Sequence, residues 1–155
     1  MHTRILAVGD RQPAWVGEAV SHYASRLPSD WRFRVDTLPT AKRSKAGGGK
    51  RAREAETREL LDRTSDEFRV LLDEQGSALS SSALAAKLSG WHRDGRNLCF
   101  LIGGPDGVTA ELREQADFVW SLSPLTLPHG LARILCVEQL YRAWSLGSGH
   151  PYHRA

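Results

Sequence analysis

Short apolar runs alternate with longer amphipathic stretches along the whole chain. Residues 5–8 (ILAV) and 98–102 (LCFLI) are unbroken apolar runs of strand length, whereas residues 130–146 carry apolar side chains at helical spacing. Such runs are typical of buried strands, and a period of about 3.6 residues is typical of helices. We predict an α/β fold with a mainly parallel, five- to six-stranded sheet and helices on both faces. The strands are predicted over residues 4–9, 31–38, 67–73, 97–102 and 118–122, and the helices over 13–26, 50–63, 80–93, 109–117 and 130–146.

Capping and turn residues support these boundaries. Pro13 suits the first turn of the first helix, and Pro28 follows its far end. Ser80 or Ser81 can cap the third helix, and Gly95 can end it.

The composition is that of one globular domain. Of 155 residues, 41% are hydrophobic and 25% are charged, which excludes intrinsic disorder and allows one continuous core. We therefore predict a single domain over residues 1–155. No apolar run reaches the length of a membrane span, and residues 1–4 do not resemble a signal peptide because the first strand follows at once. Cys99 and Cys136 are expected to be buried reduced thiols, so we expect a cytoplasmic protein without a membrane partner.

The basic residues are unevenly distributed. The net charge is only +3, but residues 40–49 (TAKRSKAGGG) form a predicted loop, and six basic residues and no acid lie between Lys42 and Arg53. We predict that Lys42 and Arg43 belong to a basic arm that grips RNA phosphates, with a solvated charge run as the alternative. The glycines before Lys50 do not form a nucleotide-phosphate loop, because Arg51 occupies the required Ser/Thr position.

Two loops follow neighbouring apolar strands in the C-terminal half. The strand over 97–102 runs into Gly103-Gly104-Pro105-Asp106-Gly107, and the strand over 118–122 runs into residues 123–128 (SPLTLP). Parallel strands end at one edge of a sheet, where open α/β folds bind their ligands. We therefore predict a ligand site between these loops.

Nine segments in register give the chain a resemblance to a known family. The chain is similar over essentially its whole length to the small SPOUT-class methyltransferases, in particular those that methylate N3 of a pseudouridine in large-subunit (23S) ribosomal RNA. The segments are ILAVG (5–9), PAWV (13–16), LPSDW (27–31), AKR (41–43), LDEQG (72–76), LIGGPDG (101–107), SLSPLTLPH (121–129), YRAWS (141–145) and HPYHRA (150–155). The resemblance implies a C-terminal trefoil knot, S-adenosylmethionine as cofactor, a homodimer with shared active sites, and action on the ribosome.

The resemblance also implies cofactor contacts at particular positions. Adenine requires a dry slot lined by apolar side chains and backbone amides, although core packing is the alternative for the leucines. Gly103 and Gly104 are expected to let the backbone approach the ribose, and Pro124 cannot donate a hydrogen bond. The predicted cofactor-binding residues are Leu72, Gly103, Gly104, Leu122, Ser123, Pro124, Leu125, Thr126 and Leu127.

Catalysis requires a group that receives the N3 proton of the acceptor base. His129, directly after the second loop, is the best-placed titratable residue, with a helix-capping or packing role as the alternative. Arg133 lies one helical turn further, and we predict it as the second catalytic residue, placed to meet an RNA phosphate. Arg142 can instead pair with Glu138 at i,i+4.

The C-terminal tail mixes an aromatic ring with cationic groups. Residues 150–154 cannot continue a helix across Pro151 and are too polar for a core, so a disordered end is the alternative to a function. Such a mixture is typical of contacts with unpaired RNA, and in the resembling family the tail reaches the substrate. We predict substrate contacts by Tyr152, His153 and Arg154, and no metal site because His150 and His153 lack a third ligand.

The last helix has apolar residues on more than one side. One side can face the sheet, and the other requires a partner, so we predict a homodimer through this helix. Two functional alternatives remain: a SPOUT methyltransferase with another RNA target, and a non-catalytic RNA-binding module.

Overall fold

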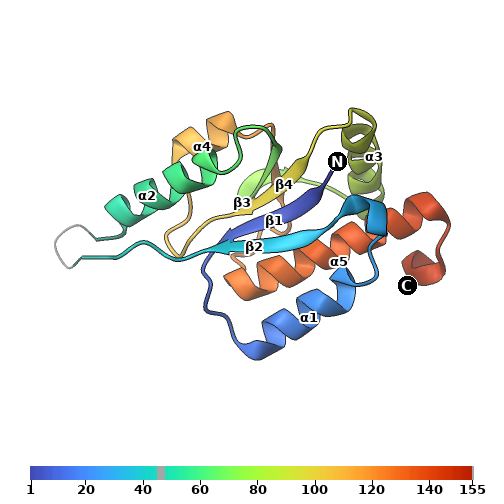
Figure 1. Cartoon of the computed structure of the whole chain (residues 1–155), viewed down its shortest axis with the longest axis horizontal. Helices are drawn as coiled ribbons and strands as arrows, with labels where there is room; N and C mark the ends of the chain where they lie inside the picture. The colour runs from blue at the N-terminus through green and yellow to red at the C-terminus, as the bar shows by residue number, and fades with distance from the viewer. Residues whose placement is uncertain (45–47, 155) are drawn as a thin grey trace.

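A computed structural model describes residues 1–44 and 48–154, with only the backbone described for Arg154. Its centre is one five-stranded sheet in the order β2-β1-β4-β3-β5, in which every paired neighbour is parallel (Figure 1). The strands are β1 (Thr3–Val8), β2 (Arg34–Leu38), β3 (Phe68–Ala78), β4 (Leu98–Ile102) and β5 (Phe118–Ser121). The helices are α1 (Ala14–Ala24), α2 (Gly48–Asp62), α3 (Ser81–Arg93), α4 (Ala110–Gln115) and α5 (His129–Ser148), with 3-10 turns η1 (Ser29–Trp31) and η2 (Pro151–Arg154).

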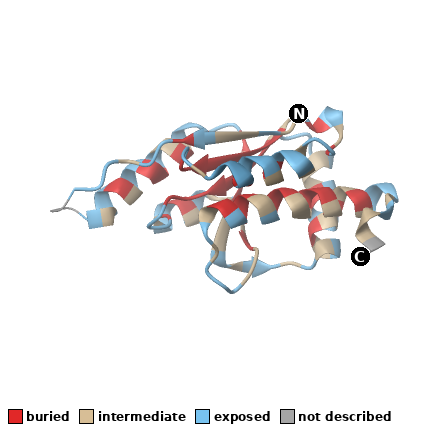
Figure 2. Ribbon diagram, turned by 90° about the horizontal axis from the view of Figure 1, so that it is seen from below, coloured by how far each residue is buried: buried red, intermediate tan, exposed pale blue. Residues whose placement is uncertain are grey.

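Helices cover both faces of the sheet, as the sequence predicted. Helices α1, α3 and α5 pack together on one face, and α2 and α4 lie on the other (Figure 1). Each face has its own apolar core, and the central strands β1 and β4 are buried along their whole length. Buried residues concentrate on the strands and in stripes along the helices (Figure 2). The α/β fold with a mainly parallel sheet is therefore confirmed, and the knot stays a prediction.

Most element boundaries lie within about two residues of the predicted ones, and three of the differences bear on the fold or the site. Strand β2 begins at Arg34 because residues 29–31 form η1, which buries Trp31. Helix α2 begins at Gly48, within the predicted loop. Strand β3 continues to Ala78 because its pairing with β5 shifts: Leu72 and Ser77 both face Trp120, so the residues between them bulge out of the ladder.

The predicted caps and thiols agree with the structure. The Ser80 hydroxyl accepts a hydrogen bond from the Ala83 amide at 3.1 Å, which caps α3. Cys99 and Cys136 are both free and buried. Burial raises the pKa of the Cys99 thiol to about 12, so this thiol stays protonated at neutral pH.

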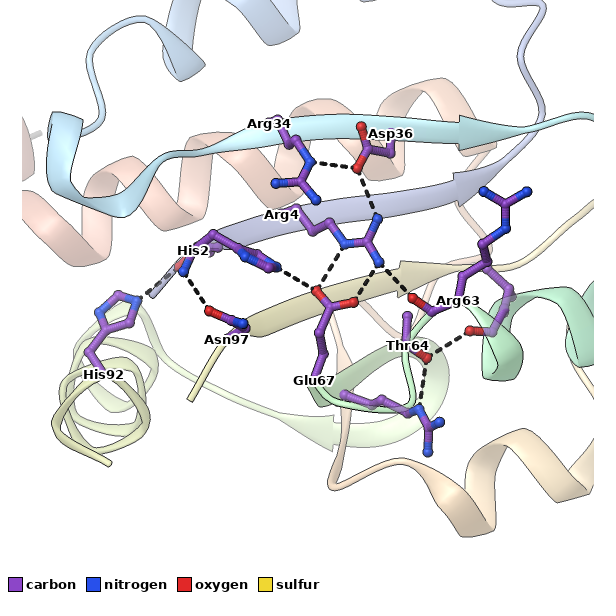
Figure 3. A network of polar contacts seen from close by, with 12 residues as sticks. His2, Arg4, Arg34, Asp36, Arg63, Thr64, Glu67, His92 and Asn97 are labelled. Atoms are coloured by element: carbon purple, nitrogen blue, oxygen red, sulfur yellow. Dashed lines mark hydrogen bonds and ion pairs between the residues drawn. The ribbon is translucent and has the colours of Figure 1, made fainter. Parts of the chain in front are cut away.

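A network of polar contacts closes the amino-terminal edge of the sheet (Figure 3). Arg4, on β1, donates two hydrogen bonds to Glu67, at 2.9 and 2.5 Å, and one to Asp36 at 2.9 Å. It also donates to the Arg63 carbonyl, while His2 lies 2.9 Å from Glu67. This network joins β1, β2, the end of α2 and the start of β3.

Candidate active site

A cleft of about 370 Å³ lies at the carboxyl-terminal edge of the sheet. Because all strands are parallel, the loops after β4 and β5 meet there beside the bulge in β3, and Ala132 and His129 of α5 close one side. The two loops that the sequence predicted as a ligand site therefore lie together, as expected for an open α/β fold.

Eight of the nine predicted cofactor residues line this cleft. They are Leu72, Gly103, Gly104, Leu122, Ser123, Leu125, Thr126 and Leu127. Pro124 is exposed and is not among the described residues that line the cleft, so its contact with the cofactor stays a prediction. Leu125 is 70% exposed, which excludes core packing as the reason for this leucine.

The two glycines of the first loop have a packing role besides the predicted approach to the ribose, which stays a prediction. A Cβ on Gly103 would collide with the Val108 side chain, and one on Gly104 would collide with the Glu56 carboxylate. Neither position therefore has room for a side chain beside these neighbours. These glycines let the loop fold against itself and against α2, and the turn is closed by a 3.0 Å hydrogen bond from the Gly107 amide to the Gly104 carbonyl.

The bulge in β3 adds polar groups that sequence reasoning missed. Asp73, Glu74 and Gln75 line the cleft beside Arg113. Arg113 pairs with Asp73 at 2.6 Å, and the Thr126 hydroxyl donates to Glu74 at 2.7 Å. The second bond ties the β5 loop to the bulge. The segment LDEQG was the only signal in the sequence, since a bulge depends on the register with another strand.

His129 lies at the start of α5 between two hollows. It lines the cleft and also a second hollow of about 470 Å³. Burial lowers the pKa of His129, and the nearby Arg133 charge lowers it further, against opposing effects of Glu56 and of the Val8 and Gly104 carbonyls. An imidazole of lowered pKa is unprotonated at neutral pH and can accept a proton, as a general base must.

Arg133 does not occupy the position predicted for it. The residue is 5% exposed and its guanidinium donates to the Gly9 carbonyl, so in this chain it does not face solvent for an RNA phosphate. Its Nε atom has no hydrogen-bond partner among the described residues. Burial lowers the pKa of Arg133, against the attraction of Asp10.

Arg43 also differs from the prediction. It donates to both oxygens of the buried Glu56, at 2.8 and 3.1 Å, and to Asp106 at 3.1 Å. The Ala41 amide donates to the same Glu56 carboxylate at 3.0 Å. Arg43 therefore fastens the basic segment to α2 and to the Gly103–Gly107 loop, whereas the arm prediction required a free guanidinium. Burial would lower the pKa of Arg43, but the hydrogen bond to Glu56 outweighs it and raises the pKa.

The rest of the basic arm is only partly described. Lys42 is exposed, as a phosphate contact requires. Lys45 lies outside the described residues.

The tail is ordered against α5, contrary to the disordered alternative, and α5 ends at Ser148 without crossing Pro151, as predicted. Pro151 begins η2, and the Tyr152 ring lies 4.5 Å from the Tyr141 ring. The Tyr152 hydroxyl donates to Glu138 at 2.9 Å, and Glu138 also pairs with Arg142, as predicted. His153 is half-buried and its Nδ1 atom has no partner among the described residues, while the Arg154 side chain lies outside them.

Helix α5 separates the tail from the cleft. The helix has 20 residues, and at 1.5 Å per residue it spans roughly 30 Å. His129 begins this helix and the tail follows its other end, so the docked tail cannot reach the cleft of its own chain.

Membrane-spanning helices and clusters of metal ligands are both absent from the described residues. No helix in this part of the chain is both long and apolar enough to span a membrane. No three metal-binding side chains of the His, Cys, Asp or Glu type gather within it.

Comparisons with known proteins agree with this fold. Residues 1–153 match the family model described as "Predicted SPOUT methyltransferase". The chain is 46% identical to the ribosomal RNA large subunit methyltransferase H of Thioalkalivibrio sulfidiphilus, covering 99% of each, and 46% identical to that of Alkalilimnicola ehrlichii, covering 100% of each. A probable methylase family protein from Haemophilus influenzae has the same fold, with a TM-score of 0.60 at 13% identity over 97% of this chain and 67% of that one. The chain therefore belongs to the SPOUT methyltransferase family.

Proposed function

We propose that this protein uses S-adenosylmethionine to methylate large-subunit ribosomal RNA, at N3 of a pseudouridine in the assembled ribosome. The full-length relatives that share 46% of its sequence carry the name ribosomal RNA large subunit methyltransferase H. The observation that carries the proposal is the cleft, which eight residues implied by the family resemblance line together. The proposed substrate places the protein with ribosomes in the cytoplasm.

The cleft has properties that suit the proposed cofactor. Its volume of about 370 Å³ is within the range of small-molecule sites. Leu72, Leu122 and Leu127 offer an apolar surface for the adenine ring. Three carboxylates (Asp73, Glu74 and Asp106) and one guanidinium (Arg113) line the cleft, an excess of negative charge that suits a cationic sulfonium. When bound, the cofactor supplies an activated methyl group.

We assign separate roles to the protein's own residues. The Gly103–Gly107 and 122–127 loops bind and orient the cofactor. His129, at the rim shared by both hollows, receives the N3 proton. Lys42 contacts an RNA phosphate, while Arg43 holds the arm in place.

The active unit is proposed to be a homodimer. Trp15 at the start of α1 and Leu131 and Leu135 on α5 are 53%, 39% and 37% exposed, an unusual set of large apolar side chains on two helices that pack together. A two-fold contact through α1 and α5 would cover them. With α5 antiparallel across such a contact, the tail of one chain would come near the cleft of its partner, where Tyr152, His153 and Arg154 could contact RNA.

Methylation of purified ribosomes tests the proposal directly. The purified protein with S-adenosylmethionine should add one methyl group to large-subunit RNA, and mass mapping should locate it on a pseudouridine. A methyl group on another RNA would favour a different SPOUT target. Cofactor binding without transfer to any RNA would favour a binding module.

A further inference from the structure

The second hollow has no role in the cofactor site. Gly9, Asp10 and Gln12 after β1 form one side of it, and Thr40 after β2 forms another. Pro105 and His129 line both this hollow and the cofactor cleft. The two hollows are therefore neighbours with a common wall, which is the arrangement that transfer between two bound molecules requires.

A buried cation that forms no ion pair among the described residues lies behind this hollow. The Arg133 guanidinium donates to the carbonyl of Gly9, a lining residue, and would lie 3.5 Å from a Cβ on Gly9. Among the described residues Arg133 forms no ion pair, and its Nε atom has no partner. Burying a cation in this way is costly unless a negative charge compensates it. The exposed Asp10 is the acid that attracts it, and it lies at the hollow.

The neutral polar groups of the hollow suit a uracil ring. The Gln12 amide and the Thr40 hydroxyl can each donate or accept, and uracil-type bases offer two carbonyl acceptors and N–H donors. The volume of about 470 Å³ is large enough for a base taken out of its stack. Arg11, exposed and also part of the lining, can meet the phosphate of that nucleotide.

We propose that this second hollow binds the acceptor base, with its N3–H toward His129, and that the buried charge of Arg133 stabilises the anion formed when N3 loses its proton. This inference rests on the proposed function and deepens it. The N3 proton passes to the unprotonated nitrogen of His129. The N3 electron pair then forms the bond to the methyl carbon, while the carbon–sulfur bond breaks and its electrons pass to the sulfonium sulfur. Arg133 does not touch the base and is a positioning residue.

Filling the hollow tests the binding site. Thr40→Trp places a large ring in it from an exposed position, and Thr37→Trp, exposed on β2 but not part of the lining, is the matched control. For Thr40→Trp we expect S-adenosylmethionine affinity within about twofold of wild type by calorimetry, and a loss of methyl transfer of about 100-fold or more. Thr37→Trp should keep both. Wild-type transfer by Thr40→Trp would overturn the proposal.

A binding experiment separates this inference from the proposed function. Pseudouridine 5′-monophosphate added to the labelled protein without cofactor should shift the resonances of Gly9, Gln12 and His129 in wild type but not in Thr40→Trp. Shifts confined to other residues would overturn the proposal that this hollow binds the acceptor base, even if ribosomes are methylated. If wild type methylates no large-subunit RNA, the proposed function fails, whatever the nucleotide does.

Replacing Arg133 tests its charge. Arg133→Met keeps the volume and removes the cation, while Arg133→Lys keeps the cation. Because a neighbouring cation lowers the pKa of His129, Arg133→Met should raise that pKa in an NMR titration and shift the acid limb of the pH–rate profile to higher pH. The rate should fall about 10- to 1000-fold with cofactor affinity unchanged, and Arg133→Lys should restore much of it. An unchanged His129 pKa and pH profile in Arg133→Met would overturn the role of Arg133.

Discussion

The buried arginines at the two edges of the sheet differ in how many hydrogen-bond partners they have. At the amino-terminal edge, Arg4 donates to Glu67, Asp36 and a backbone carbonyl, so its donors are used within the protein (Figure 3). At the carboxyl-terminal edge, Arg133 is as deeply buried but has one carbonyl contact and an unused Nε–H among the described residues. Removing one partner of a fully paired buried cation is strongly destabilising, whereas a buried cation with unused donors is available to a ligand.

The backbone shows the same contrast. The amino-terminal edge has regular pairing from Phe68 and Leu98 onward. The carboxyl-terminal edge has the bulge in β3 and two glycines with no room for a side chain. The irregular edge forms the hollows, and the regular edge holds the strands in register.

Removing a partner from the amino-terminal network should have the largest effect on stability. Glu67→Ala leaves Arg4 buried without its main acceptor, so we expect the free energy of unfolding to fall by about 3–5 kcal/mol in urea titrations. Glu59→Ala, which breaks the exposed pair with Arg63, is the control and should cost less than about 1 kcal/mol. Equal effects of the two changes would remove the distinction between the edges.

The same network should make stability sensitive to acid. Burial would raise the pKa of Glu67, but hydrogen bonds from Arg4 and His2 outweigh it, so its pKa is lowered in the folded state. A lowered pKa stabilises the fold above the unfolded-state pKa, and this stabilisation is lost as pH falls through the folded-state value. Unfolding free energy measured at decreasing pH should therefore fall below about pH 4.5 in wild type, and by less in Glu67→Gln.

A side chain on the first loop should damage cofactor binding. Gly103→Ala forces its Cβ against Val108, which displaces the loop, so we expect at least about a tenfold loss of S-adenosylmethionine affinity by calorimetry. Val108→Ala added to this variant should restore part of the affinity by making room. Gly90→Ala, on α3 with open space around it, should leave affinity unchanged and is the control. Normal binding by Gly103→Ala would place the cofactor elsewhere.

Alanine substitutions of two neighbouring basic residues should affect different properties, ribosome binding in one case and stability in the other. Lys42→Ala should weaken ribosome binding and reduce its salt dependence by up to about one unit of slope, without affecting stability. Arg43→Ala leaves the buried Glu56 without its ion pair, so we expect a loss of about 1–3 kcal/mol in unfolding free energy. If Arg43→Ala changes only the salt slope, Arg43 is an RNA contact after all.

The tail should contribute only modestly to stability. Tyr152→Phe removes one hydrogen bond to Glu138 and should cost about 1 kcal/mol in unfolding free energy. Ending the chain after Gly149 should cost somewhat more, because the ring contact with Tyr141 is also lost. Methyl transfer by that truncated protein should nevertheless collapse if the tail serves the partner's site. Near-normal transfer would show that the tail only packs on α5.

The amino-acid pattern was enough to predict the layers of the fold and the two loops that meet at the cleft. Unbroken apolar runs such as residues 98–102 must be buried on both faces, so they specify central parallel strands and place their following loops at one edge. The capping of α3 by Ser80 and the i,i+4 pair of Glu138 with Arg142 were also predictable, because each depends only on residues within one helical turn.

Which charged side chains form hydrogen bonds within the protein depends on the tertiary structure. Arg43 and Arg133 were both predicted from the sequence to contact RNA. In the structure Arg43 donates hydrogen bonds to Glu56 on α2, and Arg133 donates one to the Gly9 carbonyl directly after β1. The bulge after Leu72 depends on β5, about 50 residues later, and the docking of Tyr152 depends on the α5 surface. These outcomes depend on contacts between distant segments, because burial and pairing are properties of the packed chain and not of any local pattern.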